Sequence, residues 1–302
     1  MGKETLIIVE SNGKTNKIEK FTGHSCIASF GHIFALKPTL NWFDHNNVKP
    51  EYIPIKNKEK TLQELKKKAK KASKIIIASD LDREGEAIAA HLMKFLKLDP
   101  KKTDRITFNQ ISEKALKHAL NNPGKLDENL YHSQQARAVI DLVFGFTVSP
   151  FLSRHLGVRA LSAGRCQSPA IRMIYERENE QKIGKIKLKI TGTGKCLSQI
   201  NHIKPEIKLS NVESWLSNLK TETYLVKEIK ESEKKETPPP PFITSTLQQE
   251  AYNKHGLNPK HTMQIAQSLY ENGFITYMRT DCVTLSPQFQ EDAKNWIIYN
   301  FI

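Results

Sequence analysis

The first third of this chain contains the sequence Lys74-Ile75-Ile76-Ile77-Ala78-Ser79-Asp80-Leu81-Asp82-Arg83-Glu84-Gly85-Glu86. It begins with a short continuous apolar run, which predicts a strand buried on both faces of a parallel sheet. It ends in an acidic cluster, and apolar residues at helical spacing then follow, namely Ile88, Leu92, Phe95 and Leu96. We therefore expect a buried strand, an acidic loop and a helix that starts near Glu84.

The neighbouring segments extend the same alternation in both directions. Thr5–Val9 is a second short apolar run, and Thr61–Glu64 reads as a capping box that opens a helix before residue 74. Arg105–Phe108 predicts another strand, and Ser112–Leu120 predicts another helix. Residues 1–125 are therefore interpreted as an α/β domain with a mostly parallel sheet and a short excursion near residues 37–60.

The remainder of the chain contains three regions with different sequence patterns. Residues 126–184 have helical periodicity with an expected break at Ser149-Pro150, and residues 185–237 have strand-like patterns at Lys185–Thr191 and Tyr224–Val226. Four prolines, Pro238–Pro241, form a stiff connector into residues 238–302. In that last region we expect one helix over 262–270 and another from about residue 287.

The composition favours an intracellular protein that binds a polyanion. Among 302 residues, 46 Lys and Arg against 32 Asp and Glu give a formal charge of +14, and nucleic acid is the leading polyanionic partner. Four cysteines have no paired spacing, which argues against a zinc ribbon or a disulfide framework: Cys26, Cys166, Cys196 and Cys282. No stretch reads as a secretory signal or as apolar enough to cross a membrane, so we expect a soluble protein with no membrane partner.

Acidic residues follow two of the predicted strands. Glu10 and Asp80 stand where their strands stop, and the carboxyl ends of parallel strands form the ligand crevice of an open α/β sheet. With Asp82 they form a cluster of hard oxygen ligands suited to Mg²⁺, and Lys14 could reach a phosphate at the same place. An EF-hand is excluded because its twelfth position would be His91. The alternative is that the acids only cap the following helix.

A tyrosine near the other end of the chain is a candidate nucleophile. Tyr277 stands two residues before Arg279, and in an extended segment the two side chains can lie on the same side. A phenol is a poor nucleophile at neutral pH, so it needs nearby positive charge to attack phosphorus. The alternative is that Tyr277 only packs against Phe274 and Ile275.

Seven ordered motifs give the chain a resemblance to type IA DNA topoisomerases. The Toprim domain of that family is matched by Ile8–Ser11 with Lys14, by Ser29–Ile33 and by Asp80–Glu86. Its strand-binding groove is matched by Gln134–Arg137 with Asp141 and by Leu161–Ser168. Its active-site segment is matched by Pro241–Gln249 and Ile275–Asp281. The resemblance implies a Toprim-type sheet domain, a helical strand-binding domain over 126–184, a partial β arch over 185–237 and the start of a helical tyrosine domain over 238–302.

The resemblance also implies a reaction. Tyr277 would attack single-stranded or negatively supercoiled DNA, become linked to the 5′ phosphate and later religate the strand without a nucleotide cofactor. Glu10, Asp80 and Asp82 would hold Mg²⁺, Lys14 and Arg279 would stabilise the phosphate, and Glu84 would support the metal cluster or orient the others. The DNA strand would be gripped by His32, Arg137, Asp141, Phe146, Ser162, Ala163, Gly164, Arg165, Cys166 and Gln167.

The chain departs from the family pattern in several places. Asn12-Gly13, Ala138 and Cys282 stand where other residue types are usual, and members of the family continue well beyond the tyrosine. We therefore expect an incomplete ring that needs a second polypeptide for strand passage. Two alternatives from other classes are a noncatalytic nucleic-acid-binding remnant and a Toprim nuclease or primase in which Tyr277 is idle.

Overall fold

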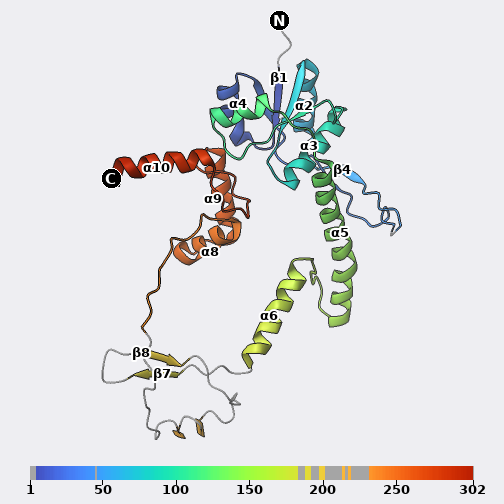
Figure 1. Cartoon of the computed structure of the whole chain (residues 1–302). Coiled ribbons are helices and arrows are strands. Elements are labelled where there is room, and N and C mark those ends of the chain that lie inside the picture. The colour runs from blue at the N-terminus through green and yellow to red at the C-terminus, as the bar shows by residue number, and fades with distance from the viewer. Residues whose placement is uncertain are drawn as a thin grey trace. The chain divides into compact units, whose positions relative to one another are not determined.

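The computed structural model describes residues 5–44, 46–182, 188–191, 197–200, 213–214, 217–218 and 231–301. The chain forms two compact units, the first made of Met1–Leu142 with Pro238–Ile302 and the second of Val143–Thr237. The first unit thus contains both ends of the chain, as the blue and red ribbons show (Figure 1). The predicted division at residues 125, 184 and 237 into four domains stays a prediction.

The first unit is built on a four-stranded parallel sheet in the order β2-β1-β5-β6. These strands are β1 (Thr5–Val9), β2 (Ser25–Ala28), β5 (Lys74–Ala78) and β6 (Asp104–Arg105). Strands β1 and β5 lie side by side with Val9 opposite Ala78, so their carboxyl ends meet at one edge of the sheet. The predicted α/β class with a parallel sheet is confirmed, although the strand expected over Arg105–Phe108 is only two residues long and starts at Asp104.

Alternate side chains of β1 enter two separate cores, as the two-residue period of a strand requires. Ile7 and Val9 join a cluster with helices α1 (Thr15–Thr22) and α4 (Glu113–Asn121). Leu6 and Ile8 join the other cluster, with helices α2 (Glu59–Lys71) and α3 (Arg83–Leu96). Burial on both faces explains why β1 and β5 read as continuous apolar runs rather than as alternating ones.

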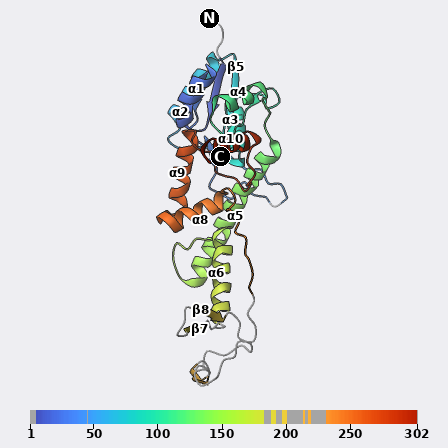
Figure 2. The ribbon, with the colours of Figure 1, turned by 60° about the vertical axis from the view of Figure 1, so that its left-hand side comes forward.

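The carboxyl-terminal segment packs on the α1 and α4 side of this sheet. It forms α8 (Thr244–His255), α9 (Pro259–Glu271) and α10 (Pro287–Phe301), drawn in orange to red (Figures 1 and 2). These helices belong to the same unit as β1 and α1. Ala266 and Tyr270 of α9 are buried in the same cluster as Ile7 and Val9. The helices predicted over 262–270 and from residue 287 are confirmed, the first of them beginning earlier, at Pro259, behind the N-cap Asn258.

The helix before β5 begins earlier than the sequence suggests. Its N-cap is Lys58, which makes no side-chain capping bond, so the predicted capping box at Thr61–Glu64 is wrong and lies inside the helix. Glu59 in the first turn favours the positive end of the helix dipole and supports the earlier start. The excursion near residues 37–60 includes β4 (Tyr52–Pro54), which pairs antiparallel with β3 (Phe34–Leu36).

The long helix α5 (Glu128–Leu156) runs through Pro150, so the break predicted at Ser149-Pro150 is wrong. A proline removes one hydrogen bond and bends a helix without always ending it. By length and composition alone α5 could cross a membrane, which the sequence analysis did not anticipate. One such helix is a weak indication, and Gln134 and Arg137 in its first half bond to Glu84 of the sheet domain.

In the second unit, α6 (Gln167–Lys182) and the antiparallel strands β7 (Leu188–Thr191) and β8 (Leu197–Ile200) follow. Strand β7 agrees with the last four residues of the predicted strand at Lys185–Thr191. The rest of that prediction, and all of the strand predicted at Tyr224–Val226, lie outside the described residues.

Candidate active site

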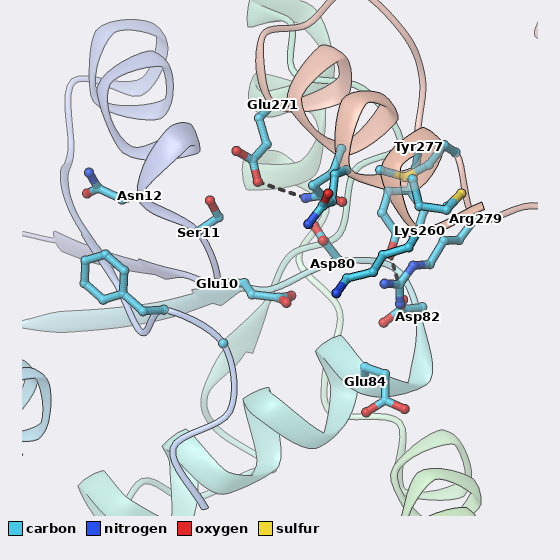
Figure 3. Close-up of a pocket in the computed structure, with 16 residues that line it drawn as sticks. Glu10, Ser11, Asn12, Asp80, Asp82, Glu84, Lys260, Glu271, Tyr277 and Arg279 are labelled. Atoms are coloured by element: carbon cyan, nitrogen blue, oxygen red, sulfur yellow. Dashed lines mark hydrogen bonds and ion pairs between the residues drawn. The ribbon is translucent and has the colours of Figure 1, made fainter. Parts of the chain in front are cut away.

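The carboxyl ends of β1 and β5 open onto a cavity of about 710 Å³ within the first unit. Glu10 follows β1 directly, and Asp80 follows β5 by two residues, so the parallel pairing brings two distant carboxylates together. Six of the predicted site residues line the cavity: Glu10, Asp80, Asp82, Glu84, Tyr277 and Arg279. Figure 3 shows Tyr277 and Arg279 beside the acidic loop.

Asp82 joins the acidic loop to the tyrosine segment. Its Oδ2 accepts a 2.7 Å hydrogen bond from the Tyr277 hydroxyl and a 3.1 Å bond from Nη1 of Arg279. Its Oδ1 accepts from the backbone N–H of Gly85 at 2.8 Å and caps α3. Burial on its own would raise the pKa of Asp82, but the bonds from Tyr277 and Gly85 and the charge of Arg279 hold it below its ordinary value. Asp82 therefore caps α3, as the capping alternative expects, and also contacts the tyrosine segment, while its role as a metal ligand stays a prediction.

Tyr277 is held in place on three sides. Its backbone N–H donates to the carbonyl of Asn109 at 2.7 Å, its ring lies 5.1 Å from that of Tyr270 in an edge contact, and its hydroxyl donates to Asp82. Only 7% of the residue is exposed. Burial, and next the hydrogen bond to the Asp82 carboxylate, raise the pKa of Tyr277 well above its ordinary value. In this arrangement the side chain is a neutral phenol whose proton points at a carboxylate.

Arg105 is almost fully buried and hydrogen-bonds to the backbone of the acidic loop. It donates 2.9 Å bonds to the carbonyls of Ser79 and Asp80 and pairs with Glu86, 3.1 Å from Nη2 to Oε2. Gly85 lies under the same loop, where an added Cβ would stand 2.2 Å from the Asp80 carbonyl oxygen. Gly85 is therefore required because the backbone of Asp80 approaches it closely. The sequence analysis did not identify Arg105, because nothing in its local sequence indicates a partner far away in the chain.

Lys14 does not line the cavity. It is fully buried, it forms an ion pair with Oδ1 of Asp80, and its ammonium lies 5.2 Å from the centre of the Tyr270 ring. In this arrangement it neutralises one carboxylate of the cluster. Its expected contact with the scissile phosphate stays a prediction.

The acid cluster has the oxygen ligands of a magnesium site, but its carboxylates are not arranged as a metal-binding group in the described residues. Among the described residues, no three His, Cys, Asp or Glu side chains converge closely enough to hold a metal ion. Burial of Glu10, and next the charge of Asp80, raise the pKa of Glu10 from 4.5 to about 7. A bound cation would relieve the repulsion between the two carboxylates. Since Mg²⁺ needs only one or two carboxylates besides water and substrate phosphate, Glu10 and its neighbours fit it as a donor set.

Glu84 lies at the other end of the cavity and contacts residues predicted to bind DNA. Its Oε1 accepts from Nη1 of Arg137 at 2.9 Å, and its Oε2 lies 3.1 Å from Nε2 of both His32 and Gln134. Arg137 also stands 3.9 Å from Asp141. Glu84 therefore contacts three side chains from outside the metal cluster, and its expected role in supporting that cluster or orienting the other catalytic residues stays a prediction.

The other residues predicted to grip DNA belong to the second unit. Phe146 is half exposed on α5. Residues 162–166 lead into α6, where the Ser162 hydroxyl donates to Oε1 of Gln167, the first residue of that helix, at 3.3 Å. The backbone N–H of Ala163 donates to Ser149 at 2.9 Å and its side chain is buried, so its methyl group offers little surface to a strand. The strand-gripping role of Ser162, Ala163, Gly164, Arg165, Cys166 and Gln167 stays a prediction.

Helix α9 supplies cavity residues that the sequence analysis missed. Lys260, Gln264, Gln267 and Glu271 all line the cavity and recur at three- and four-residue intervals, so they share one face of the helix. Figure 3 labels Lys260 and Glu271 among the residues that line the cavity, and Nε2 of Gln267 donates to Glu271 at 2.8 Å. The signal that could have found them is this polar stripe, opposite the apolar face of Ala266 and Tyr270.

Comparisons with known proteins agree with this geometry. A family model described as DNA topoisomerase matches residues 125–301, and one described as Toprim domain matches residues 5–111. The solved structure of full-length topoisomerase I from Thermotoga maritima is similar with a TM-score of 0.77 at 37% identity, over 98% of this chain. The match spans 52% of the length of that protein. The chain therefore belongs to the type IA DNA topoisomerase family.

Proposed function

We propose that this chain carries the strand-cleaving site of a DNA topoisomerase. The observation that supports the proposal best is the 2.7 Å hydrogen bond from Tyr277 to Asp82, which joins residues 195 positions apart in the chain. A candidate nucleophile, a carboxylate and a guanidinium thereby share one cavity with Glu10 and Asp80. Single-stranded DNA is the substrate, and the intracellular setting follows from that substrate.

The reaction balances with the residues present and one proton from solvent. The Tyr277 oxygen attacks the phosphorus, its proton passes to Oδ2 of Asp82, the bond from phosphorus to the 3′ oxygen breaks, and that oxygen takes up a solvent proton as a 3′ hydroxyl. The product is a 5′-phosphotyrosine. Religation is the same step reversed, and no nucleotide cofactor is consumed because the new ester keeps the energy of the broken one.

Arg279 links substrate arrival to activation of the phenol. In the structure its guanidinium bonds to Asp82, and that contact helps to lower the pKa of the carboxylate and so weakens it as a base. An entering phosphate offers Arg279 a second anionic partner, and movement of the guanidinium to it would leave Asp82 free to take the phenolic proton while Arg279 stabilises charge on phosphorus. Mg²⁺ held by Glu10 and Asp80, the carboxylates of the cluster that do not take the phenolic proton, would supply further positive charge at the phosphate.

The test is covalent capture. The chain is incubated with a single-stranded oligonucleotide labelled at its 3′ end in Mg²⁺ and denatured, and labelled protein is detected on a gel. We expect an adduct with the native chain, none with Tyr277→Phe, and an unchanged adduct with Tyr252→Phe, which alters an exposed tyrosine on α8 outside the cavity.

Three other outcomes would count against the proposal. Oligonucleotide binding without an adduct, in Mg²⁺ and with either protein, would favour a noncatalytic binding remnant. Metal-dependent cutting by both the native chain and Tyr277→Phe would favour a Toprim nuclease. An adduct that survives Tyr277→Phe would place the nucleophile elsewhere.

A further inference from the structure

Phe30 is an exposed aromatic residue at the edge of the candidate active site. It lines the same cavity as Glu10, Tyr277 and Arg279, and 56% of the residue is accessible to solvent. It takes no part in either hydrophobic core of the described residues. Among the described residues that line the cavity, Phe30 and Tyr277 are the two aromatic ones. Neither hydrophobic core of the described residues therefore explains why a phenylalanine stands there.

The backbone of Phe30 is strained. Its φ is +56°, in the left-handed region that a bulky L-residue adopts only at a free-energy cost, and Gly31 follows with a φ of +85°. A glycine at position 30 would adopt the same backbone without that cost. Such strain persists where surrounding structure enforces it, and it concentrates at sites that clamp ligands.

The surrounding structure fixes this loop against the end of β1. The N–H of Ser29 donates to the Val9 carbonyl at 2.8 Å, and the N–H of Gly31 donates to the Glu10 carbonyl at 3.0 Å. Lys58 donates to the carbonyls of Ser29, at 3.2 Å, and Phe30. The Lys58 ammonium also lies 5.9 Å from the centre of the Phe30 ring. The loop is thus tied to the end of β1 and to Glu10, and its exposed ring lines the same cavity as the acid cluster.

We propose that Phe30 is a stacking platform for an unpaired base next to the scissile phosphate. The inference rests on the proposed function, because an enzyme that cleaves a single strand must hold bases as well as phosphates. Every base has a π face, so an aromatic ring accepts any base, and one such contact changes affinity by roughly 5- to 150-fold. Lys58 adds positive charge beside the ring, which suits the neighbouring backbone.

The experiment measures binding and stacking separately. Fluorescence anisotropy with a single-stranded oligonucleotide, in EDTA so that no cleavage competes, gives the dissociation constant. Oligonucleotides with 2-aminopurine at successive positions report stacking, because a stacked 2-aminopurine is quenched. We expect Phe30→Ala and Phe30→Leu to weaken binding by about 5- to 20-fold and to relieve quenching at one position, whereas Phe30→Trp retains both. Phe289→Ala, at a comparably exposed phenylalanine of α10 outside the cavity, should match the native chain.

Phe30→Gly separates a binding role from a structural one. It removes the ring and the strain together, so it should melt at or above the temperature of the native chain while it binds the oligonucleotide as weakly as Phe30→Ala. A lower melting temperature for Phe30→Gly, or native affinity and quenching in Phe30→Leu, would overturn the inference.

Failure of this inference can be told from failure of the proposed function. If the native chain forms the Tyr277 adduct and all Phe30 variants bind and quench like it, the platform is refuted and the cleavage function stands. If no adduct forms but binding still depends on the ring at position 30, the platform stands and the cleavage function is refuted.

Discussion

Replacing Arg105 by methionine should destabilise the first unit by about 3 to 5 kcal/mol, the cost of breaking a buried ion pair from one side. Arg105 and Glu86 are both nearly fully buried, and their closest N–O distance is 3.1 Å. The substitution leaves the Glu86 carboxylate without its counter-charge and removes the donors to the carbonyls of Ser79 and Asp80. Domains of this kind are stable by roughly 5 to 15 kcal/mol, so the variant should still fold.

The assay is urea unfolding at pH 7, followed by circular dichroism, on three proteins: Arg105→Met, Glu86→Met and the double variant. Each single variant leaves its partner charge buried alone, whereas the double variant removes both charges. The double variant should therefore be no less stable than Arg105→Met, with a coupling free energy of at least about 2 kcal/mol between the two sites. The Tyr277 adduct should form more slowly in Arg105→Met, because the Asp80 carbonyl loses its support.

Additivity would refute this reasoning. If the losses of the two single variants sum to the loss of the double variant within about 0.5 kcal/mol, the pair is not coupled, and Arg105 acts only through its bonds to carbonyls. A loss below about 1 kcal/mol in Arg105→Met would show that water replaces the guanidinium, against the burial seen here.

Two further predictions concern charge in the cavity. The pKa of Glu10 is about 7 in the folded chain against an ordinary 4.5, so the stability it contributes is complete below pH 4.5 and is lost as pH rises through 7. Glu10→Gln should therefore gain up to about 3 kcal/mol over the native chain at pH 8 in EDTA and nothing at pH 4, and a pH-independent difference in urea unfolding would contradict this. Lys260 lines the cavity, so Lys260→Gln should weaken binding of single-stranded DNA and flatten its log–log salt dependence by about 0.7. Lys60→Gln, on α2 and outside the cavity, is the control, and equal salt slopes for the two variants would exclude a phosphate contact by Lys260.

Local pattern was enough to predict most of the sheet domain. A strand buried on both faces must be apolar along its buried part, and Leu6–Val9 and Ile75–Ala78 have that property, so the positions of β1 and β5 followed from the local sequence pattern. Element ends were less predictable. Thr61 looks like a cap but lies inside α2, and Pro150 looks like a stop but lies inside α5, because hydrogen bonding and packing elsewhere outweigh one residue's local preference.

In the candidate site, too, backbone positions could be predicted from the sequence, whereas long-range side-chain contacts could not. The rule that parallel strands present their carboxyl ends together predicts that Glu10 and Asp80 are neighbours, and it needs no knowledge of side-chain contacts. The predictions for Lys14 and Glu84 depended on where long side chains point. Lys14 points inward and pairs with Asp80, and Glu84 points toward Arg137 and His32. These orientations depend on partners far away in the chain. Arg105 was missed for the same reason.

The attachment of Tyr277 to this site is mainly hydrophobic, although its chemistry is polar. Tyr270, Tyr277 and Met278 are buried in the same core cluster as Ile7 and Val9 of β1, so the burial that holds the sheet domain together also positions the candidate nucleophile. The Tyr277 hydroxyl makes a polar contact with Asp82. Burial and that bond raise the pKa of the phenol, and the bonds from Tyr277 and Gly85 and the charge of Arg279 lower the pKa of Asp82. In the proposed reaction, an entering phosphate would compete with Asp82 for Arg279, and that exchange would change the surroundings of both other residues. The proposed mechanism would thereby couple activation of Tyr277 to the presence of substrate, without a separate switch.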